Sequence, residues 1–228
     1  MVFVIGDLHL SFGVDKPMEI FGYNWENHIE KLTNNWIEQV KEDDTVILAG
    51  DFSWSSNLDD AYKDFEYINN LPGKKILLKG NHDYWWSTLT KMNKYLEEKN
   101  FKNIYFLHNN SYEFEDFEIV GTKGWSDQEI TGYEKNILRE IGRLKTSIES
   151  TKTDKPKIAV IHHPPFFTGE KEEYKFTKIL EENNVKKCYY GHLHGSSHIN
   201  AIQGSINGVE YHLISGDYLD FRLKLIEL

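Results

Sequence analysis

The sequence predicts an α/β protein built on two mixed β-sheets, for two reasons. Short apolar stretches rich in β-branched residues alternate with longer stretches of helical period, and two candidate hairpins lie in the later part of the chain. Alternation of strand and helix favours parallel pairing through crossover connections, whereas hairpins add antiparallel strands. The stretches expected to form the alternating strands are Met1–Ile5, Thr45–Ala49, Lys75–Leu78, Ile104–Leu107, Lys157–Ile161 and Lys187–Tyr190.

Three segments between these strands have the spacing of amphipathic helices. In Trp25–Val40 apolar residues recur every three or four positions, which places them on one stripe of a helix. Leu58–Leu71 and Leu89–Leu96 show similar spacing. The stripe expected on the first helix consists of Ile29, Leu32, Trp36, Ile37 and Val40.

The later part of the chain departs from this alternation. Ser111–Glu115 and Phe117–Gly121 have the pattern of one hairpin. Val209–Ser215 and Phe221–Glu227 have the pattern of a second, which would close the chain. Gln128–Pro156 is polar and helix-prone, and its end is rich in Ser, Thr and Pro, as in an exposed connection.

Length and composition bound the class of protein. The chain has 228 residues, of which 39% are hydrophobic, which is enough for one sizeable core. Because no repeat or low-complexity tract divides it, we expect a single domain, residues 1–228. The formal charge of −10 disfavours a broad electrostatic grip on nucleic acid.

Targeting signals and cysteine usage point to the cytoplasm. The opening residues lack the basic start and apolar run of a signal peptide, and no apolar span is long enough to cross a bilayer. The single cysteine, Cys188, lies in an apolar stretch, so we expect it to fill the core. We therefore expect a cytoplasmic protein without a membrane partner.

Polar motifs follow five of the predicted strands. In open α/β sheets, ligands bind beyond the carboxyl ends of the strands, so side chains from distant positions converge there. Convergence of this kind is what a metal cluster needs. The motifs are Asp7 with His9, Gly50 with Asp51, Gly80–Asp83, His162 with His163, and Gly191–His194.

Taken singly, most of these motifs are ambiguous. Asp7 with His9, or a glycine before Asp51, more often belongs to an ordinary turn. Gly80–Asp83 is more specific, because a turn needs only one or two of its three polar side chains. Jointly, two aspartates, an asparagine and four histidines form an oxygen and nitrogen ligand set that suits manganese, iron, zinc or nickel better than calcium.

The two histidine pairs carry different expectations. His192 and His194 alternate on a segment expected to be extended, so both rings would point to one side and could contact two adjacent ions. His162 and His163 close an apolar strand, and the prolines that follow stiffen the outgoing chain. One histidine of this second pair is expected to be structural.

The ordered set of motifs resembles the calcineurin-like metallophosphoesterase family. The family pattern is Asp-x-His, Gly-Asp, Gly-Asn-His, His and Gly-His-x-His, and all five blocks are present between Asp7 and His194. The resemblance implies a four-layer αββα sandwich and a centre of two divalent cations. It also implies the ligands: for the first ion Asp7, His9 and His194, for the second Asn81, His162 and His192, and Asp51 as the bridge.

The family's catalytic histidine corresponds to His82, which the resemblance places near the phosphate or the leaving oxygen and not on a metal. After Asp51 many members carry a second aspartate and then an arginine, but here Trp54 and Ser55 stand instead. The aspartate usually orients the catalytic histidine. Either Asp83 or a residue elsewhere replaces it, or His82 works without that support.

The missing arginine removes a phosphate clamp, and few residues offer a replacement. Two of the three arginines lie one helical turn apart and could reach phosphate, although surface charge is the commoner explanation. The arginines are Arg139, Arg143 and Arg222. Aromatic residues expected in part to wall the site are Trp54, Tyr84, Trp85 and Trp86. Histidines outside the pattern are His28, His108, His198 and His212.

The predicted activity is that of a phosphoric ester hydrolase. Two cations roughly 3.5–4 Å apart can activate a bridging hydroxide for in-line attack on a phosphomonoester or phosphodiester. Manganese is the leading candidate metal and a small phosphorylated molecule the expected substrate; the sequence leaves the oligomeric state open. One alternative is a nuclease, which lacks a visible basic track here. The other is a noncatalytic metal-binding scaffold of the same fold.

Overall fold

The computed structural model describes residues 1–125, 133–166 and 176–228. Within these residues the strands form a five-stranded sheet of order β11-β1-β2-β3-β4 and a six-stranded sheet of order β5-β6-β7-β8-β10-β9. The first sheet contains β1 (Val2–Ile5), β2 (Thr45–Ala49), β3 (Lys74–Leu78), β4 (Ile104–Phe106) and β11 (Lys224–Leu225). The second contains β5 (Tyr112–Glu113), β6 (Glu118–Thr122), β7 (Lys157–Ile161), β8 (Val185–Tyr190), β9 (Gly204–Ile206) and β10 (Val209–Leu213).

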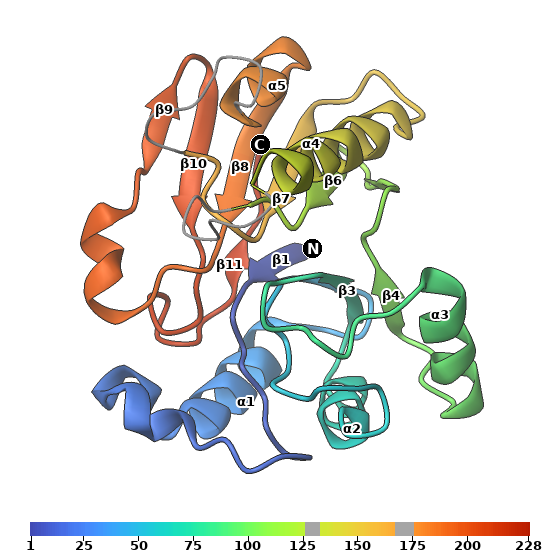
Figure 1. Cartoon of the computed structure of the whole chain (residues 1–228), viewed down its shortest axis with the longest axis vertical. Coiled ribbons are helices and arrows are strands. Elements are labelled where there is room, and N and C mark those ends of the chain that lie inside the picture. Colours follow the sequence, from blue (N-terminus) through green and yellow to red (C-terminus); the bar gives the residue numbers. More distant parts are fainter. Residues whose placement is uncertain (126–132, 167–175) are drawn as a thin grey trace.

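Helices cover the outer face of each sheet, so the molecule has four layers (Figure 1). The helices α1 and α2 lie beyond the first sheet, with α3 beside β4, and α4 and α5 lie beyond the second sheet. Their bounds are α1 (His28–Gln39), α2 (Tyr62–Asn70), α3 (Leu89–Glu98), α4 (Tyr133–Glu149) and α5 (Phe176–Glu182). The predicted α/β class with two mixed sheets is confirmed.

Parallel strands occupy the middle of both sheets, and antiparallel strands lie at their edges. In the first sheet β1, β2, β3 and β4 are parallel, and β11 pairs antiparallel with β1. In the second sheet β6, β7, β8 and β10 are parallel, with antiparallel β5 and β9 outside them. The parallel strands therefore direct their carboxyl ends toward a common edge of each sheet, where polar loops can meet.

The strands alternate their side chains between two apolar cores. In β1, Phe3 and Ile5 pack toward the helices, whereas Val2 and Val4 face the other sheet. The central core between the sheets also takes residues from β7, such as Val160. Because both faces of these strands are buried, their sequences read as continuous apolar runs. Cys188 is fully buried in the core beneath α4 and α5, as predicted.

The first predicted hairpin is confirmed, since β5 and β6 pair antiparallel. The second is wrong. Val209–Leu213 pairs parallel with β8, while Lys224–Leu225 pairs with β1 in the other sheet. The segment between them crosses from one sheet to the other, with Ile214 in the central core and Phe221 in the core of the first sheet. Alternation identifies the two faces of a strand but not its partner.

The actual hairpin near the end of the chain joins β9 and β10. Its turn is Asn207-Gly208, and both residues have positive φ, 50° and 85°. Asn-Gly between two strands is a strong signal for a two-residue hairpin turn, because both central positions need positive φ. The Asn-Gly pair was present in the sequence. It is a stronger indication of a hairpin than the alternation that suggested pairing Val209–Ser215 with Phe221–Glu227.

The helix predictions hold with shorter bounds and one error. Leu32 and Trp36 of α1 are fully buried, but Ile37 is 62% exposed and does not belong to the buried stripe. A residue directly after Trp36 is rotated by about 100° around the helix, which turns it to solvent. The predicted helical segment Gln128–Pro156 contains α4, and its residues before 133 lie outside the described residues. None of the described helices is long and apolar enough to cross a membrane.

Replacing Trp36 tests the corrected helix face. Its side chain is fully buried, and its indole N–H donates a hydrogen bond to the Pro72 carbonyl at 3.0 Å. We expect Trp36→Ala to lower the free energy of unfolding by about 3–5 kcal/mol, because it leaves a large cavity. The exposed neighbour is the control: Ile37→Ala should change it by less than about 0.5 kcal/mol in the same denaturant titration. Equal losses in both variants would contradict the assigned orientation of α1.

Candidate metal centre

The predicted ligands come together in one buried cluster at the carboxyl ends of β1, β2, β3, β7 and β8. Three groups of described residues place ligand atoms within 4.8 Å of one another. They are Asp7 with His9 and His194; Asp7 with Asp51 and His162; and His162 with His163 and His192. Strand-end placement, on which the sequence prediction rested, therefore brings five separate loops to one place.

Unusual backbone conformations hold these loops. Asp7, His9, Asp51 and His192 have positive φ, between 47° and 72°. The backbone N–H of Asp7 donates to the Gly50 carbonyl, and that of His9 donates to the Asp51 carbonyl, each at 2.9 Å. Left-handed backbone at residues other than glycine is unfavourable and persists where surrounding contacts enforce it, often at functional sites. The prediction that the segment around His192 is extended is therefore wrong, because the backbone of His192 is left-handed.

Two glycines make room for the buried carboxylates. A Cβ atom on Gly80 would lie 2.0 Å from Asp51 Oδ1, and one on Gly191 would lie 2.3 Å from Asp7 Oδ2. Neither position can accept a side chain without moving a carboxylate. The glycines of the Gly-Asn-His and Gly-His-x-His motifs are thus explained by close approach to the centre.

The first group gathers around Asp7. His194 Nε2 lies 3.4 Å from Asp7 Oδ1 and 3.4 Å from His9 Nε2. Nitrogen ligands about 2.0–2.1 Å from an ion in tetrahedral geometry are about 3.4 Å apart, so these atoms have the spacing of ligands to one cation. The Asp7 carboxylate also accepts the His192 backbone N–H at 3.0 Å, which ties the loop after β8 to the loop after β1.

A second set of side chains surrounds His162. Its Nδ1 lies 3.0 Å from the Ala49 carbonyl, so Nδ1–H is the donor and Nε2 is free to bind a cation. His162 Nε2 lies 2.7 Å from Asn81 Oδ1 and 3.4 Å from Asp51 Oδ2. The amide, the imidazole and the carboxylate thus aim at a shared point.

Asp51 lies between the side chains around Asp7 and those around His162. Its Oδ1 accepts the His82 backbone N–H at 2.8 Å, but its buried Oδ2 has no hydrogen-bond partner. That oxygen is 3.4 Å from His162 Nε2 and 3.7 Å from His9 Nε2. A buried carboxylate oxygen is costly unless positive charge meets it, so the residues present fit a metal centre.

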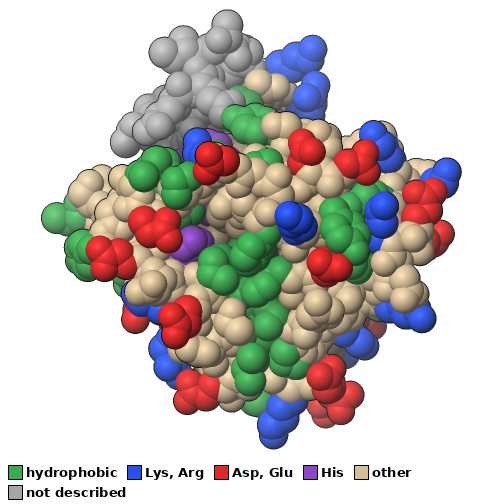
Figure 2. Space-filling view, turned by 90° about the horizontal axis from the view of Figure 1, so that it is seen from below, with side chains coloured by type: hydrophobic (Ala, Val, Ile, Leu, Met, Phe, Trp, Pro, Cys, Tyr) green, Lys and Arg blue, Asp and Glu red, His purple; other side chains and the backbone are tan. Residues whose placement is uncertain are grey.

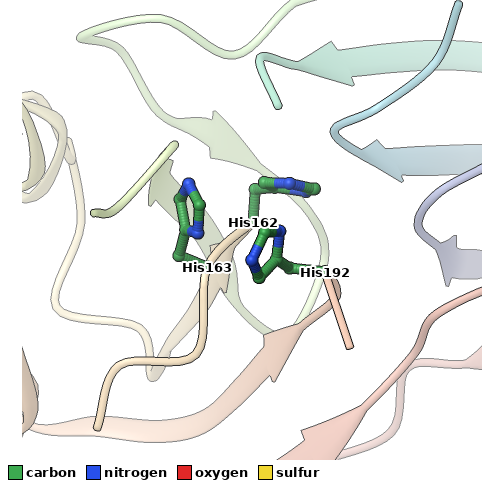
Figure 3. Close-up of side chains that lie close together, drawn as sticks. All are labelled: His162, His163 and His192. Atoms are coloured by element: carbon green, nitrogen blue, oxygen red, sulfur yellow. The ribbon is translucent and has the colours of Figure 1, made fainter. Parts of the chain in front are cut away.

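His163 is predicted to have a structural or supporting role, and its ring lies against the rings of His162 and His192. Figure 3 shows its ring close to those of His162, also from the end of β7, and of His192, from the end of β8. The His163 and His192 ring centroids are 4.2 Å apart. Both His163 ring nitrogens are buried and have no hydrogen-bond partner among the described residues, and burial holds the pKa of His163 below its ordinary value. A neutral imidazole in this place can offer a nitrogen to a cation.

Asp217 is a supporting residue that sequence reasoning missed. Its Oδ1 accepts His194 Nδ1–H at 2.8 Å, and its Oδ2 accepts the Gly195 backbone N–H at 2.9 Å. The unassigned His198 also lies 3.3 Å from this carboxylate. A carboxylate on Nδ1 fixes the tautomer that leaves Nε2 for a metal. Asp217 follows β10 in a Ser-Gly-Asp sequence, so the strand-end rule could have found it.

Comparison with known proteins agrees with the geometry. A family model described as calcineurin-like phosphoesterase matches residues 1–196. The chain belongs to the calcineurin-like phosphoesterase family. The family is metal-dependent, which accords with the candidate ligand groups.

Individual relatives of this phosphoesterase are distant. The chain is 37% identical to the Gene 66 protein of Mycobacterium phage L5 over 79 residues, which are 34% of this chain and 37% of that protein. Phosphopantetheinyl hydrolase (PptH) from Mycobacterium tuberculosis matches with a TM-score of 0.59 at 11% identity, over 99% of this chain and 95% of that chain. TT1561 from Thermus thermophilus matches with a TM-score of 0.54 at 14% identity, over 85% and 81%. These two structures support the fold alone.

The position after Asp51 that departs from the family pattern has its own packing. The Trp54 ring stacks on His9 with centroids 4.8 Å apart and lies 4.4 Å from the His82 ring. Ser55 is buried and bonds through its hydroxyl to Asp64 at 3.4 Å. The indole therefore occupies the space beside His82, the predicted catalytic histidine.

Asp83 does not replace the missing aspartate. Its carboxylate accepts the backbone N–H groups of Phe52 and Gly80 at 2.9 and 2.7 Å and the Trp85 indole N–H at 2.9 Å. It thus joins the loops after β2 and β3. His82 Nδ1 is buried without a hydrogen-bond partner, so no carboxylate among the described residues orients it. Burial and the nearby Asp51 charge raise the pKa of Asp83 to about 6.

The arginines lie in ion pairs or on the surface. Arg143 pairs with Glu140 within α4, Arg222 lies 3.5 Å from Glu38, and Arg139 is exposed. The described contacts of the three arginines are those of ordinary surface charge. Of the aromatic residues expected to wall the site, Trp54 lines a pocket beside the ligands, whereas Trp85 is buried in the core of the first sheet.

Two of the candidate ligand histidines have raised pKa values. Burial opposes their charge, but Asp51 and Asp7 raise the pKa of His162 to about 9, and Asp7 and Asp217 raise that of His194 to about 10. Burial lowers the pKa of His9 and of His192 to about 4. At neutral pH two imidazolium groups therefore balance the carboxylates.

Loading the centre should release protons, because cations and protons compete for the nitrogens of His162 and His194. Near pH 7 we expect about two protons released per filled centre, and apparent affinity should rise with pH until about 9–10. Calorimetric titration of metal-free protein in buffers of different ionisation enthalpy measures the number. Heats that do not depend on the buffer would contradict the assigned protonation.

Removing the Asp217 carboxylate should weaken metal binding without unfolding the protein. Asp217→Asn removes the negative charge and places an amide N–H against either His194 or Gly195. We expect about 10–100-fold lower metal affinity, measured by competition with a chelating dye. Asp220→Asn is the matched control, because that carboxylate is 75% exposed and pairs with Lys31 at the surface. An Asp217→Asn affinity equal to the control's would exclude this role.

Proposed function

We propose that this chain hydrolyses a small phosphomonoester or phosphodiester with two bound divalent cations, manganese being the leading candidate. The observation that carries the proposal is the position of Asp51 Oδ2. It is buried without a partner, 3.4 Å from His162 Nε2 and 3.7 Å from His9 Nε2. An oxygen shared between two nitrogen-bearing groups is suited to bridge two ions.

The ligand assignment follows from this bridge. Asp7, His9 and His194 would hold the first ion, and their ligand atoms form one of the compact groups. Asn81, His162 and His192 would hold the second. His163 remains beside the second ion as a supporting residue. Mixed carboxylate, amide and imidazole ligands suit manganese, iron, zinc or nickel.

When bound, the ions would supply an activated water and neutralise charge that develops on the phosphoryl oxygens. The chain's own residues perform the remaining tasks. Asp51 receives the His82 backbone N–H at 2.8 Å, which fixes the loop that carries the imidazole. Since His82 Nδ1 is buried, Nε2 is the ring nitrogen that can reach the leaving oxygen and donate a hydrogen bond to it.

The surface offers little support for the nuclease alternative. On the face shown in Figure 2, Lys and Arg side chains are scattered among Asp and Glu and form no continuous track. Nucleic-acid binding usually relies on such a track. A noncatalytic scaffold is disfavoured because the sequence retains every proposed ligand and His82. We propose that the protein acts in the cytoplasm, as one domain, on a small phosphorylated molecule.

Two substitutions test the activity. With manganese-loaded protein and para-nitrophenyl phosphate and bis(para-nitrophenyl) phosphate as substrates, we expect Asp51→Asn to lower kcat/KM by about 10²-fold or more, with loss of bound metal. His82→Ala should lower kcat by about 10²–10⁴-fold while metal content stays unchanged. Steady-state kinetics and elemental analysis of the same samples provide both readings.

The matched control is Asp116→Asn, an exposed carboxylate outside the described ligand groups, which should leave both readings unchanged. A wild-type protein that binds two ions but turns over neither substrate would support the scaffold alternative. Activity that survives in both Asp51→Asn and His82→Ala would overturn the proposal.

A further inference from the structure

A pocket of about 330 Å³ opens directly beside the metal centre. Its volume is at the lower end of the range found for small-molecule sites. It shares His9 and His194 with the candidate ligand groups and also contains His82, so a molecule bound there would touch the proposed catalytic region. The described lining residues are His9, Met18, Phe21, Trp25, Trp54, His82, His194, Gly195 and Ser196.

The wall of this pocket is largely aromatic, and its described lining residues include no carboxylate, ammonium or guanidinium group, although Lys16 Nζ lies 4.3 Å from the centre of the Trp54 ring. Trp25 is 2% exposed, and Trp54 is held by an indole N–H that donates to Met18 Sδ at 3.0 Å. Phe21 is 53% exposed. A cationic group entering here would lose water without gaining an opposite charge, whereas an apolar ring would gain contact area.

The position of Trp54 connects the pocket to the reaction. Its ring stacks on the proposed ligand His9 and lies 4.4 Å from the His82 ring. His82 is the side chain expected at the leaving oxygen. The pocket therefore lies on the leaving-group side of the centre, and the family position that often carries a carboxylate here supplies an aromatic surface instead.

We propose that this pocket receives an uncharged aromatic group attached to the leaving oxygen of the phosphoester substrate. The inference rests on the proposed function and narrows its substrate class. Planar rings pack well against Trp and Phe side chains, in stacked or edge-to-face arrangements. A substrate without such a ring binds the metal centre alone.

A matched pair of esters tests substrate choice. Benzyl phosphate and ethyl phosphate both join phosphorus to a CH₂–O group, so they differ mainly in the ring. We expect wild-type kcat/KM to be at least about tenfold higher for benzyl phosphate, because burial of the ring stabilises the complex. Phe21→Ala should reduce this ratio several-fold. Tyr105→Ala is the control: that aromatic residue on β4 is 40% exposed and does not line the pocket, so the ratio should stay at the wild-type value.

A binding measurement separates this inference from the proposed hydrolysis. Benzylphosphonate and methylphosphonate are titrated into manganese-loaded wild-type protein while the indole fluorescence is followed. We expect benzylphosphonate to bind at least about tenfold more tightly, and Phe21→Ala to remove most of the difference. Tight benzylphosphonate binding without turnover of either ester would overturn the hydrolytic function and support the aromatic pocket. Equal affinity for the two phosphonates, or a preference that Phe21→Ala leaves intact, would overturn the pocket assignment.

Discussion

The buried carboxylate of Asp51 joins the two halves of the molecule, and the centre depends on it. Asp51 follows β2 of the first sheet, and its free oxygen faces His162 from β7 of the second sheet. Burying an unpaired charge is strongly unfavourable, so the cluster must gather positive charge around this oxygen, either as protons on histidines or as metal ions. Histidine pKa values raised by Asp7 and Asp51 show the first solution. The same electrostatic demand favours the second.

The surrounding loops are shaped to keep that charge in place. A side chain at Gly80 or Gly191 would clash with the carboxylate of Asp51 or Asp7, so glycine is needed at both positions. Asp83 fastens the loops after β2 and β3 through backbone donors, and Asp217 fastens the loop after β8 through His194 and Gly195. Strain in the left-handed residues is thus balanced by contacts from neighbouring loops. The candidate ligand groups are thus held in place by contacts within the chain itself.

The sequence predicted the centre better than the end of the fold, for a physical reason. Asp7, Asp51 and His162 each follow an apolar strand, and parallel strands bring their carboxyl ends to one edge whatever the details of the loops. The strand that pairs with Val209–Leu213 depends on which sheet edge is open. The alternation of apolar and polar side chains along a strand carries no information about which edge that is. The position of Asp217 after β10 could have marked it as a strand-end residue, but its role depends on a contact with His194 across the fold, which the sequence does not show.

His82 marks where this chain differs from the general family pattern. Its imidazole packs against Trp54 and has no carboxylate on Nδ1, and burial holds its pKa below the ordinary value. A carboxylate partner would stabilise the protonated ring; an indole face gives it position without that stabilisation. A neutral imidazole donates one hydrogen bond but does not readily give up a proton. The arrangement therefore leaves His82 to hold the leaving oxygen by a hydrogen bond, while the indole of Trp54 fixes where the imidazole stands.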